Sequence, residues 1–289
     1  GKSTLLNELT NAEVDTGAYE FTTLEVNPGM LKHRGANIQI LDVPGLIGGA
    51  ADGRGGGTQV LSVVRNADLI LIVLDPEEMR YKEITDEVYK AGLRTNMEPP
   101  NMKIEKKERG GINISSTVDL ELGEETIKDL MHQNGYGNAE VIIREQMDLD
   151  RFIDGLMDNR KYLPSVEVVN KADMLDSGKE EKFGEEYDLL ISAETGQNLD
   201  ELKDLIFERM GLIRVYMKEK NEEADKDEPL ILREGDRVED ALDKLPGDMK
   251  DRFKHARVTG PSSKFPEQKV SEKHELQDED ILQLNLRHI

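Results

Sequence analysis

The sequence contains no cysteine and no tryptophan. Without cysteine there can be no disulfide framework, no thiolate metal site and no cysteine nucleophile. Long apolar runs are absent as well. The longest, LILIVL at 69–74, has the length of one strand, whereas a membrane-spanning helix needs about 20 apolar residues. We therefore expect a cytoplasmic protein without a membrane partner.

Positive charge is also scarce, because 38 Lys and Arg stand against 60 Asp and Glu and give a net charge of −22. Such a surface disfavours non-specific adsorption to nucleic acid or anionic lipid, since that adsorption depends on neutralising phosphates. Any contact with nucleic acid must then come from a local basic patch. Residues 103–109 and 250–273 are the two candidates, and an ordinary mixed, solvated surface is the alternative for both.

Strand-like apolar runs alternate with helical patterns, which is typical of a mostly parallel α/β sheet. Four runs fit its strands, and each ends in polar residues: 37–43, 67–75, 165–173 and 187–193. Open sheets of this class bind ligands beyond the carboxyl ends of their strands. The polar strand ends therefore mark the expected site.

The segment between 75 and 165 is too long for an ordinary loop. Its helix-like GEETIKDLMHQNG and strand-like AEVIIRE predict a small inserted α+β subdomain. A helix at 198–210 follows, with Asn198 and Glu201 as an expected capping box and Gly211 as its end.

After this helix, several short strand signals surround a short helix that Asp236 is expected to cap, and this pattern predicts a β-grasp domain. The expected division of the chain is 1–93 and 151–211 for the two parts of the first domain, 94–150 for the insert and 212–289 for the β-grasp domain.

Four short motifs, taken in chain order, each suit a guanine nucleotide. GKST leads into the helical TLLNELT, as in the second half of a phosphate loop, where Lys2 reaches the β- and γ-oxygens and Ser3 ligates Mg²⁺. About 20 residues later, YEFTTLEVNPG places Thr22 and Thr23 where a hydroxyl can join the Mg²⁺ shell and a backbone N–H can meet the γ-phosphate. Taken alone, a chance helix start and an ordinary turn explain these two motifs equally well.

The third motif is D-x-x-G, from Asp42 to Gly45, at the end of an apolar strand. The aspartate addresses Mg²⁺ through water, and the glycine N–H can approach the γ-phosphate because no Cβ intervenes. The fourth and most specific motif is NKAD at 170–173. The Asp173 carboxylate can accept from N1–H and N2–H₂ of guanine, whereas adenine has no amino group there. In the ISAETG that follows, the Ala193 N–H can meet guanine O6.

Because all four motifs stand in order at strand ends, we predict a GTP-binding domain. We expect the chain to start inside its phosphate loop, with the first loop glycine and a central strand lying upstream. Asn170 and Lys171 are expected to brace the base and the loops around it. The candidate GTP-binding residues are Gly1, Lys2, Ser3, Thr4, Phe21, Thr22, Thr23, Asp42, Gly45, Asn170, Lys171, Asp173, Ser192 and Ala193. The candidate catalytic residues are Lys2, Thr23 and Gly45, and the candidate Mg²⁺ ligands are Ser3, Thr23 and Asp42.

Four stretches, GAYEFTTLEVNPGML, IQILDVPGLIGGAADGRGGG, PPNMKIEKKERGGINI and VVNKAD, resemble the developmentally regulated GTP-binding (DRG) branch of the Obg-type GTPases. The resemblance covers essentially the whole chain. It implies a P-loop GTPase domain with a mostly parallel sheet, an inserted α+β subdomain and a C-terminal TGS domain, which is a β-grasp module. It also implies a translation-related protein that hydrolyses GTP to GDP in association with the ribosome or ribosomal RNA.

One residue departs from the pattern of small Ras-like proteins. Where those carry a water-orienting glutamine after D-x-x-G, this chain has Leu46, which cannot hold or polarise water. The resemblance implies hydrolysis assisted by a monovalent cation such as K⁺ or by a regulatory partner protein. Intrinsic turnover should then be slow, on the order of 10⁻⁴ to 10⁻³ s⁻¹. Leu46 leaves a rival open, a GTP-dependent binding module with negligible turnover, while Asp173 disfavours an ATPase.

Overall fold

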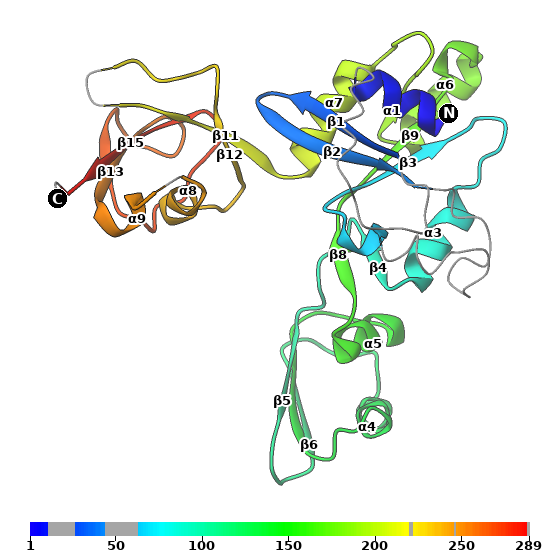
Figure 1. Cartoon of the computed structure of the whole chain (residues 1–289). Helices are drawn as coiled ribbons and strands as arrows, with labels where there is room; N and C mark the ends of the chain where they lie inside the picture. Colours follow the sequence, from blue (N-terminus) through cyan, green and yellow to red (C-terminus); the bar gives the residue numbers. More distant parts are fainter. Residues whose placement is uncertain (11–26, 44–62, 220–221, 246, 288–289) are drawn as a thin grey trace. The chain divides into compact units, whose positions relative to one another are not determined.

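The structure is a computed structural model of the chain, and it describes residues 1–10, 27–43, 63–219, 222–245 and 247–287 (Figure 1). As far as these residues reach, the chain forms two compact units. One takes in 1–45, 71–80 and 165–289, and the other takes in 46–70 and 81–164. No helix among the described residues has the length and apolar character needed to cross a bilayer.

The first unit begins with a helix packed on a β-hairpin. Helix α1 (Lys2–Thr10) precedes β1 (Asn27–His33) and β2 (Ala36–Asp42), which pair antiparallel. The turn between them needs two residues with positive φ, and Arg34 (φ 48°) and Gly35 (φ 81°) supply them. Helix α1 approaches β1 so closely that a Cβ added at Gly29 would lie 2.6 Å from the Thr10 side chain.

A second sheet of this unit carries the later motifs. Its strand order is β10-β9-β3, formed by Leu189–Leu190, Ser165–Val169 and Ile70–Leu74. Strands β9 and β10 pair in parallel, and the β9 side chains Val166, Val168 and Val169 are all buried. Burial on both faces is what the apolar sequence of such a strand predicts. The turn η2 (Ala172–Met174) and the helices α6 (Ser177–Glu186) and α7 (Leu199–Arg209) follow these strands in the same unit.

Among the described strands, β2 pairs only with β1, and β3 pairs only with β9. Within the described part of the chain, the outer edge of β2 and the outer edge of β3 are therefore both unpaired.

The predicted start of α7 is wrong in one respect. Asn198 does precede the helix, but it lies in the left-handed region (φ 58°) and its side chain makes no capping hydrogen bond. The amide instead donates to the Leu190 carbonyl at 2.8 Å, so it ties the helix start to β10. Asn tolerates this backbone region better than most residues. The predicted end is confirmed, because Gly211 (φ 60°) follows the last turn and donates to the Glu208 carbonyl.

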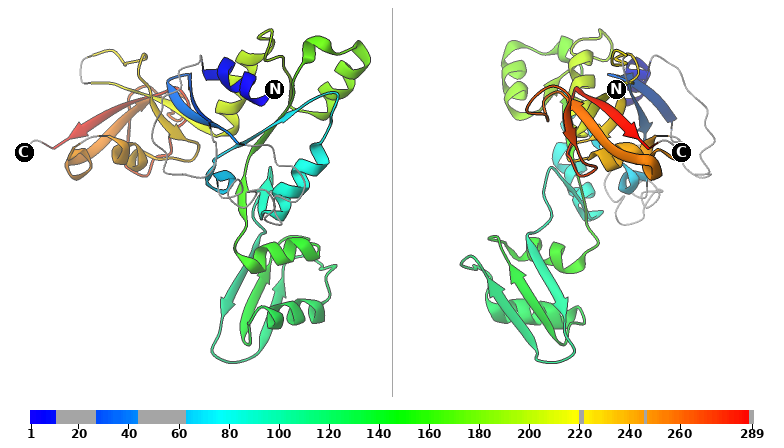
Figure 2. Two further views of the ribbon diagram at one scale, coloured as in Figure 1. Left: turned by 45° about the vertical axis from the view of Figure 1, so that its right-hand side comes forward. Right: turned by 90° about the vertical axis from the view of Figure 1, so that its left-hand side faces the viewer.

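The second unit contains the inserted subdomain. Its sheet has the order β5-β7-β6, formed by Met102–Lys106, Ala139–Ile143 and Ile112–Ser116. Helices α4 (Glu124–Gln133) and α5 (Leu149–Met157) lie on one face of this sheet (Figures 1 and 2). The core is built from side chains of the helices and of β7, with the following residues buried: Ile127, Met131, Val141, Ile143, Phe152 and Leu156. Helix α3 (Tyr81–Lys90) and the parallel pair β4 (Leu93–Thr95) and β8 (Lys161–Leu163) belong to the same unit.

A buried ion pair holds α5 against β4. Arg94 and Asp154 are 2% and 4% exposed, and the guanidinium donates to both carboxylate oxygens at 2.5 and 2.6 Å. Arg160 adds a third hydrogen bond at 2.8 Å, and the Arg94 guanidinium lies 3.5 Å from the centre of the Tyr89 ring. Burial alone would raise the pKa of Asp154, but the hydrogen bonds from the two arginines outweigh it and hold the pKa below its usual value.

The C-terminal region is a five-stranded sheet with a short helix on it. The strand order is β12-β11-β15-β13-β14, formed by Leu230–Arg233, Leu212–Met217, Asp280–Leu286, Phe253–Thr259 and Gln268–Val270. The neighbours β11 and β15 run parallel, and the other pairs run antiparallel. Helix α8 (Val238–Lys244) buries Val238, Ala241 and Leu242 in the core beneath this sheet, and α9 (Met249–Arg252) follows it.

The predicted cap of α8 is wrong. The Asp236 carboxylate accepts from the Arg233 N–H at 2.9 Å and closes the turn before the helix, so it is not available at the helix start. The N-cap position is Arg237, whose backbone N–H donates to the Asp240 carboxylate at 2.7 Å.

We predict that Asp154→Ala destabilises the inserted subdomain by about 3–5 kcal/mol, because it leaves the Arg94 guanidinium buried without its anion. The matched control is Glu105→Ala, which removes an exposed carboxylate from a surface pair with Lys103 and should leave the protection of β7 near its native level. Amide hydrogen exchange in β7 reports on this subdomain alone. Equal protection of β7 in the two variants would contradict the prediction.

Candidate functional site

Two of the three candidate Mg²⁺ ligands lie in contact. The Ser3 hydroxyl, in the first turn of α1, donates to Asp42 Oδ2 at the end of β2 over 2.6 Å. All four residues from Gly1 to Thr4 are exposed, so this corner is open to solvent. A hydroxyl and a carboxylate are hard oxygen donors of the kind that Mg²⁺ takes together with waters and phosphate oxygens. Within the described ranges, no group of three or more His, Asp and Glu side chains is placed to hold a metal ion.

Asn170 connects the start of the chain to the loop after β10. Its side chain is buried, and Oδ1 accepts the Ala193 N–H at 2.9 Å. Its backbone N–H donates to the Leu74 carbonyl of β3, also at 2.9 Å. A Cβ added at Gly1 would lie only 2.9 Å from Asn170 Nδ2, so the backbone of residue 1 lies directly against this amide. The predicted phosphate-loop end and the NKAD and ISAETG motifs are thus brought together by one side chain.

Lys171 has a carboxylate partner that the sequence motifs do not contain. Its ammonium group lies 2.7 Å from Asp75 Oδ2, just beyond β3. The hydrogen bond from Lys171 lowers the pKa of Asp75, and the same bond raises the pKa of Lys171. Lys171 also adopts the left-handed conformation (φ 62°, ψ 38°), which turns the chain from β9 into η2. The one sequence signal for Asp75 is that it forms the polar end of a predicted strand.

Asp173 lies in η2 and is exposed. The backbone around it is fixed, because the Ala172 N–H donates to the Ile191 carbonyl at 2.9 Å and the Met174 N–H donates to the Lys171 carbonyl at 3.0 Å. The carboxylate therefore projects from a rigid turn into solvent, where a base edge could meet it.

The loop after β10 is shaped by its own side chains. Ser192 is buried, and its hydroxyl accepts the Thr195 N–H at 3.2 Å. Ala193 is also buried, and its N–H is already used by Asn170. The expected contact of this N–H with guanine O6 thus requires either a shared hydrogen bond or a small shift of the Asn170 amide.

Several candidates lie outside the described residues. They are Phe21, Thr22, Thr23 and Gly45, together with Leu46. Of the remaining candidates, Lys2 and Thr4 are exposed at the start of α1, next to Ser3.

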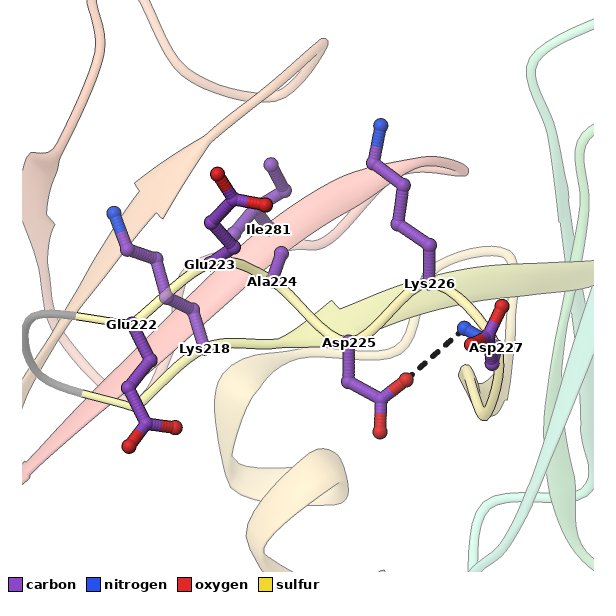
Figure 3. Close-up of a pocket in the computed structure, with 8 residues that line it drawn as sticks. All are labelled: Lys218, Glu222, Glu223, Ala224, Asp225, Lys226, Asp227 and Ile281. Carbon is purple, nitrogen blue, oxygen red and sulfur yellow. Dashed lines mark hydrogen bonds between the residues drawn. The ribbon is translucent and has the colours of Figure 1, made fainter.

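A surface hollow in the C-terminal domain is a different kind of feature (Figure 3). Charged side chains of both signs surround it, and the Asp225 carboxylate accepts the Asp227 N–H at 3.0 Å. None of the motif residues lines it. Its lining residues are Lys218, Glu222, Glu223, Ala224, Asp225, Lys226, Asp227 and Ile281.

Comparison with known proteins identifies three consecutive family matches. The family described as "50S ribosome-binding GTPase" matches residues 1–106, and the "C-terminal region of MMR_HSR1 domain" matches 109–212. The "TGS domain" family matches residues 213–285. Among curated proteins, Developmentally-regulated G-protein 3 of Arabidopsis thaliana is 41% identical over 98% of this chain and 78% of its own length. The chain belongs to the DRG family of GTP-binding proteins.

Other relatives of this DRG protein support the same family assignment. Developmentally-regulated GTP-binding protein 2 of Bos taurus is 36% identical over 98% of this chain and 79% of its own length. An uncharacterised GTP-binding protein of Halobacterium salinarum is 46% identical, over 99% and 80% respectively. The solved YchF GTPase of Schizosaccharomyces pombe has a TM-score of 0.50 at 13% identity, over 99% of this chain and 94% of that one, and shows similarity of fold alone. The predicted family and fold class, a P-loop GTPase domain followed by a TGS domain, are confirmed.

We predict that Asp173→Asn in the full-length DRG protein weakens GTP binding by more than about tenfold. Xanthine nucleotides should gain affinity, because xanthine O2 is an acceptor that the new amide can meet. Nucleotide titration of the variant measures both effects. The matched control is Glu180→Gln, which neutralises an exposed carboxylate on α6 and should change neither the GTP affinity nor the xanthine affinity. Unchanged guanine selectivity in Asp173→Asn would refute the role of the Asp173 carboxylate.

Proposed function

We propose that this DRG protein is a Mg²⁺-dependent GTP-hydrolysing switch that acts on the ribosome in the cytoplasm. The observation that carries the nucleotide part is the convergence of Ser3, Asp42 and Asn170 from three distant stretches of sequence. The translation part is supported by the description of the matching GTPase family and by the excess of basic residues in the stretch 250–273 of the TGS domain.

The residues present fit a magnesium ion. The Ser3 hydroxyl and the Asp42 carboxylate are 2.6 Å apart, Ser3 is exposed and Asp42 half-buried, and Ser3 lies in the first turn of a helix. Magnesium, when bound there, neutralises charge on the β- and γ-phosphates. Lys2 and the N–H groups at the start of α1 would hold the phosphate oxygens. Thr23 would be the third protein ligand, and the Gly45 N–H would contact the γ-phosphate.

Guanine would be held by the loops after β9 and β10. Asp173 would accept from N1–H and N2–H₂ of the base, and Ala193 would donate to O6. Asn170 fixes the relative position of the two loops, and Lys171, oriented by Asp75, would lie along the base. The remaining nucleotide contacts would come from Thr4, Phe21, Thr22 and Ser192.

Hydrolysis in this site would need help from outside the described residues. Leu46 occupies the place of a water-orienting glutamine and cannot perform that task. Turnover would therefore be slow without a monovalent cation such as K⁺ or a partner protein. A nucleotide-dependent binding module with negligible turnover is the second candidate, and a rate of GTP hydrolysis that rises when K⁺ replaces Na⁺ would exclude it.

The two basic stretches both contain ion pairs but differ in their balance of charge. In the insert, Lys103 lies 2.5 Å from Glu105, and Lys107 contacts both Glu105 and Glu140 at 3.3 and 3.1 Å. These charges are balanced across neighbouring strands, which favours an ordinary solvated surface. The stretch 250–273 of the TGS domain has seven basic residues against Asp251, Glu267 and Glu272. Three of the seven also form ion pairs, Lys250 with Asp243, Arg252 with Asp248 and Arg257 with Glu267. Its excess of positive charge favours contact with ribosomal RNA.

We predict that the double variant Arg257→Glu, Lys264→Glu loses co-sedimentation with ribosomes and keeps its GTP affinity, because both side chains are exposed in the TGS domain. The control variant Lys182→Glu, Lys226→Glu changes the net charge equally at exposed positions outside this stretch and should co-sediment normally. Binding should also weaken with added salt. Co-sedimentation that responds neither to the charge reversal nor to salt would overturn the proposed RNA contact.

A further inference from the structure

The loop between β13 and β14, residues 260–267 with the sequence GPSSKFPE, carries a large exposed aromatic ring. The Phe265 side chain is 59% exposed. Single apolar side chains on a surface are common and need no explanation. Two features distinguish this one: the rigidity of the loop that carries it and the charges that surround it.

Hydrogen bonds hold the loop along its whole length. At its start, the Ser262 N–H donates to Asp280 Oδ1 at 3.1 Å, and Asp280 is fully buried. The Ser262 hydroxyl also pairs with His274 Nε2 at 2.9 Å. Gly260 permits this approach, since a Cβ there would lie 2.5 Å from Asp280 Oδ1.

The residues on either side of Phe265 are fixed in the same way. The Lys264 N–H donates to Gln268 Oε1 at 2.7 Å, and the Glu267 N–H donates to the Thr259 hydroxyl at 2.8 Å. The backbone that carries Phe265 is thus ordered before any partner arrives. A contact made by a pre-ordered loop avoids the entropy cost of ordering it on binding.

The surroundings of the loop are cationic. Arg257 on β13 and Lys269 on β14 are register partners, and both are exposed. Lys264, also exposed, precedes Phe265 in the chain. Glu267 supplies a counter-charge, since its carboxylate lies 3.0 Å from Arg257. In a chain with a net charge of −22, three cations on this loop and on the two strands that it connects are complementary to a polyanion that carries flat apolar groups.

We propose that Phe265 is a stacking platform for one unpaired base of a single-stranded RNA segment, with Lys264, Lys269 and Arg257 on the flanking phosphates. Aromatic rings beside basic side chains are the usual means of holding unpaired nucleotides. A regular duplex cannot use the ring, because its bases are already stacked. The inference rests on the proposed RNA contact of the TGS domain and adds that the RNA target includes a splayed base.

The test uses the full-length protein, a fluorescent unstructured oligoribonucleotide of about 10 nucleotides and a duplex RNA of similar charge. Phe265→Ala should lose roughly tenfold in affinity for the single strand and almost none for the duplex. Phe265→Tyr should bind as the native protein does. Phe265→Leu keeps an apolar side chain of similar size but has no aromatic face. If stacking holds the base, this variant should therefore bind as weakly as Phe265→Ala.

The outcomes separate the stacking proposal from the proposed function. Phe265→Leu binding like the native protein, or Phe265→Ala binding the single strand unchanged, would overturn stacking. If Lys264→Glu still weakens binding to both RNAs in that case, the electrostatic contact stands alone. If Phe265→Ala loses ribosome co-sedimentation but not binding to either RNA, the ring contacts a protein partner and the stacking proposal fails. GTP affinity, measured in parallel, should be unchanged in every Phe265 variant.

Discussion

The candidate site depends on the contacts of one buried residue, Asn170. Its side-chain oxygen accepts the Ala193 N–H and its side-chain nitrogen lies against the backbone of Gly1, while the backbone N–H of the same residue donates to the Leu74 carbonyl. One residue therefore contacts three segments that are far apart in sequence. Removing its side chain would leave the buried Ala193 N–H unpaired, at a cost of about 1–3 kcal/mol, and would break the side-chain link between the loops after β9 and β10. The Ser3–Asp42 and Lys171–Asp75 contacts are more exposed and contribute orientation more than stability.

The placement of the motif residues could be predicted from the sequence, because strand-end polarity is a strong rule in α/β sheets. Ser3 and Asp42 are 39 positions apart and meet as that rule requires. The pairing of Asp75 with Lys171 could not be predicted, since no short motif contains Asp75 and its partner follows only from the strand order β10-β9-β3. The roles of Phe21, Thr22, Thr23 and Gly45 stay predictions, because these residues lie outside the described ranges.

Local capping was the least predictable feature of the fold. Asn198 and Asp236 are both good N-cap residue types, yet each side chain bonds to a nearby backbone group instead. Such short-range competition is decided by the tertiary setting and not by the residue type. The charge balance of the basic stretch in the insert is likewise decided by the tertiary structure, because the pairing of Lys107 with Glu140 requires the β5–β7 register. Ser262 and Asp280, whose hydrogen bond holds the Phe265 loop, are 18 residues apart in sequence and come into contact only in the folded sheet.

The most direct test of the nucleotide site is the affinity of Asn170→Ala for GTP and GDP, measured by titration in the full-length protein alongside Asn134→Ala. Asn134 also donates its side-chain amide to a backbone carbonyl, but it lies at the end of α4 in the insert. We expect Asn170→Ala to lose roughly tenfold or more in affinity for both nucleotides while the inserted subdomain and the TGS domain stay folded by amide hydrogen exchange. Asn134→Ala should bind both nucleotides normally. Equal affinities in the two variants would contradict the conclusion that Asn170 assembles the site.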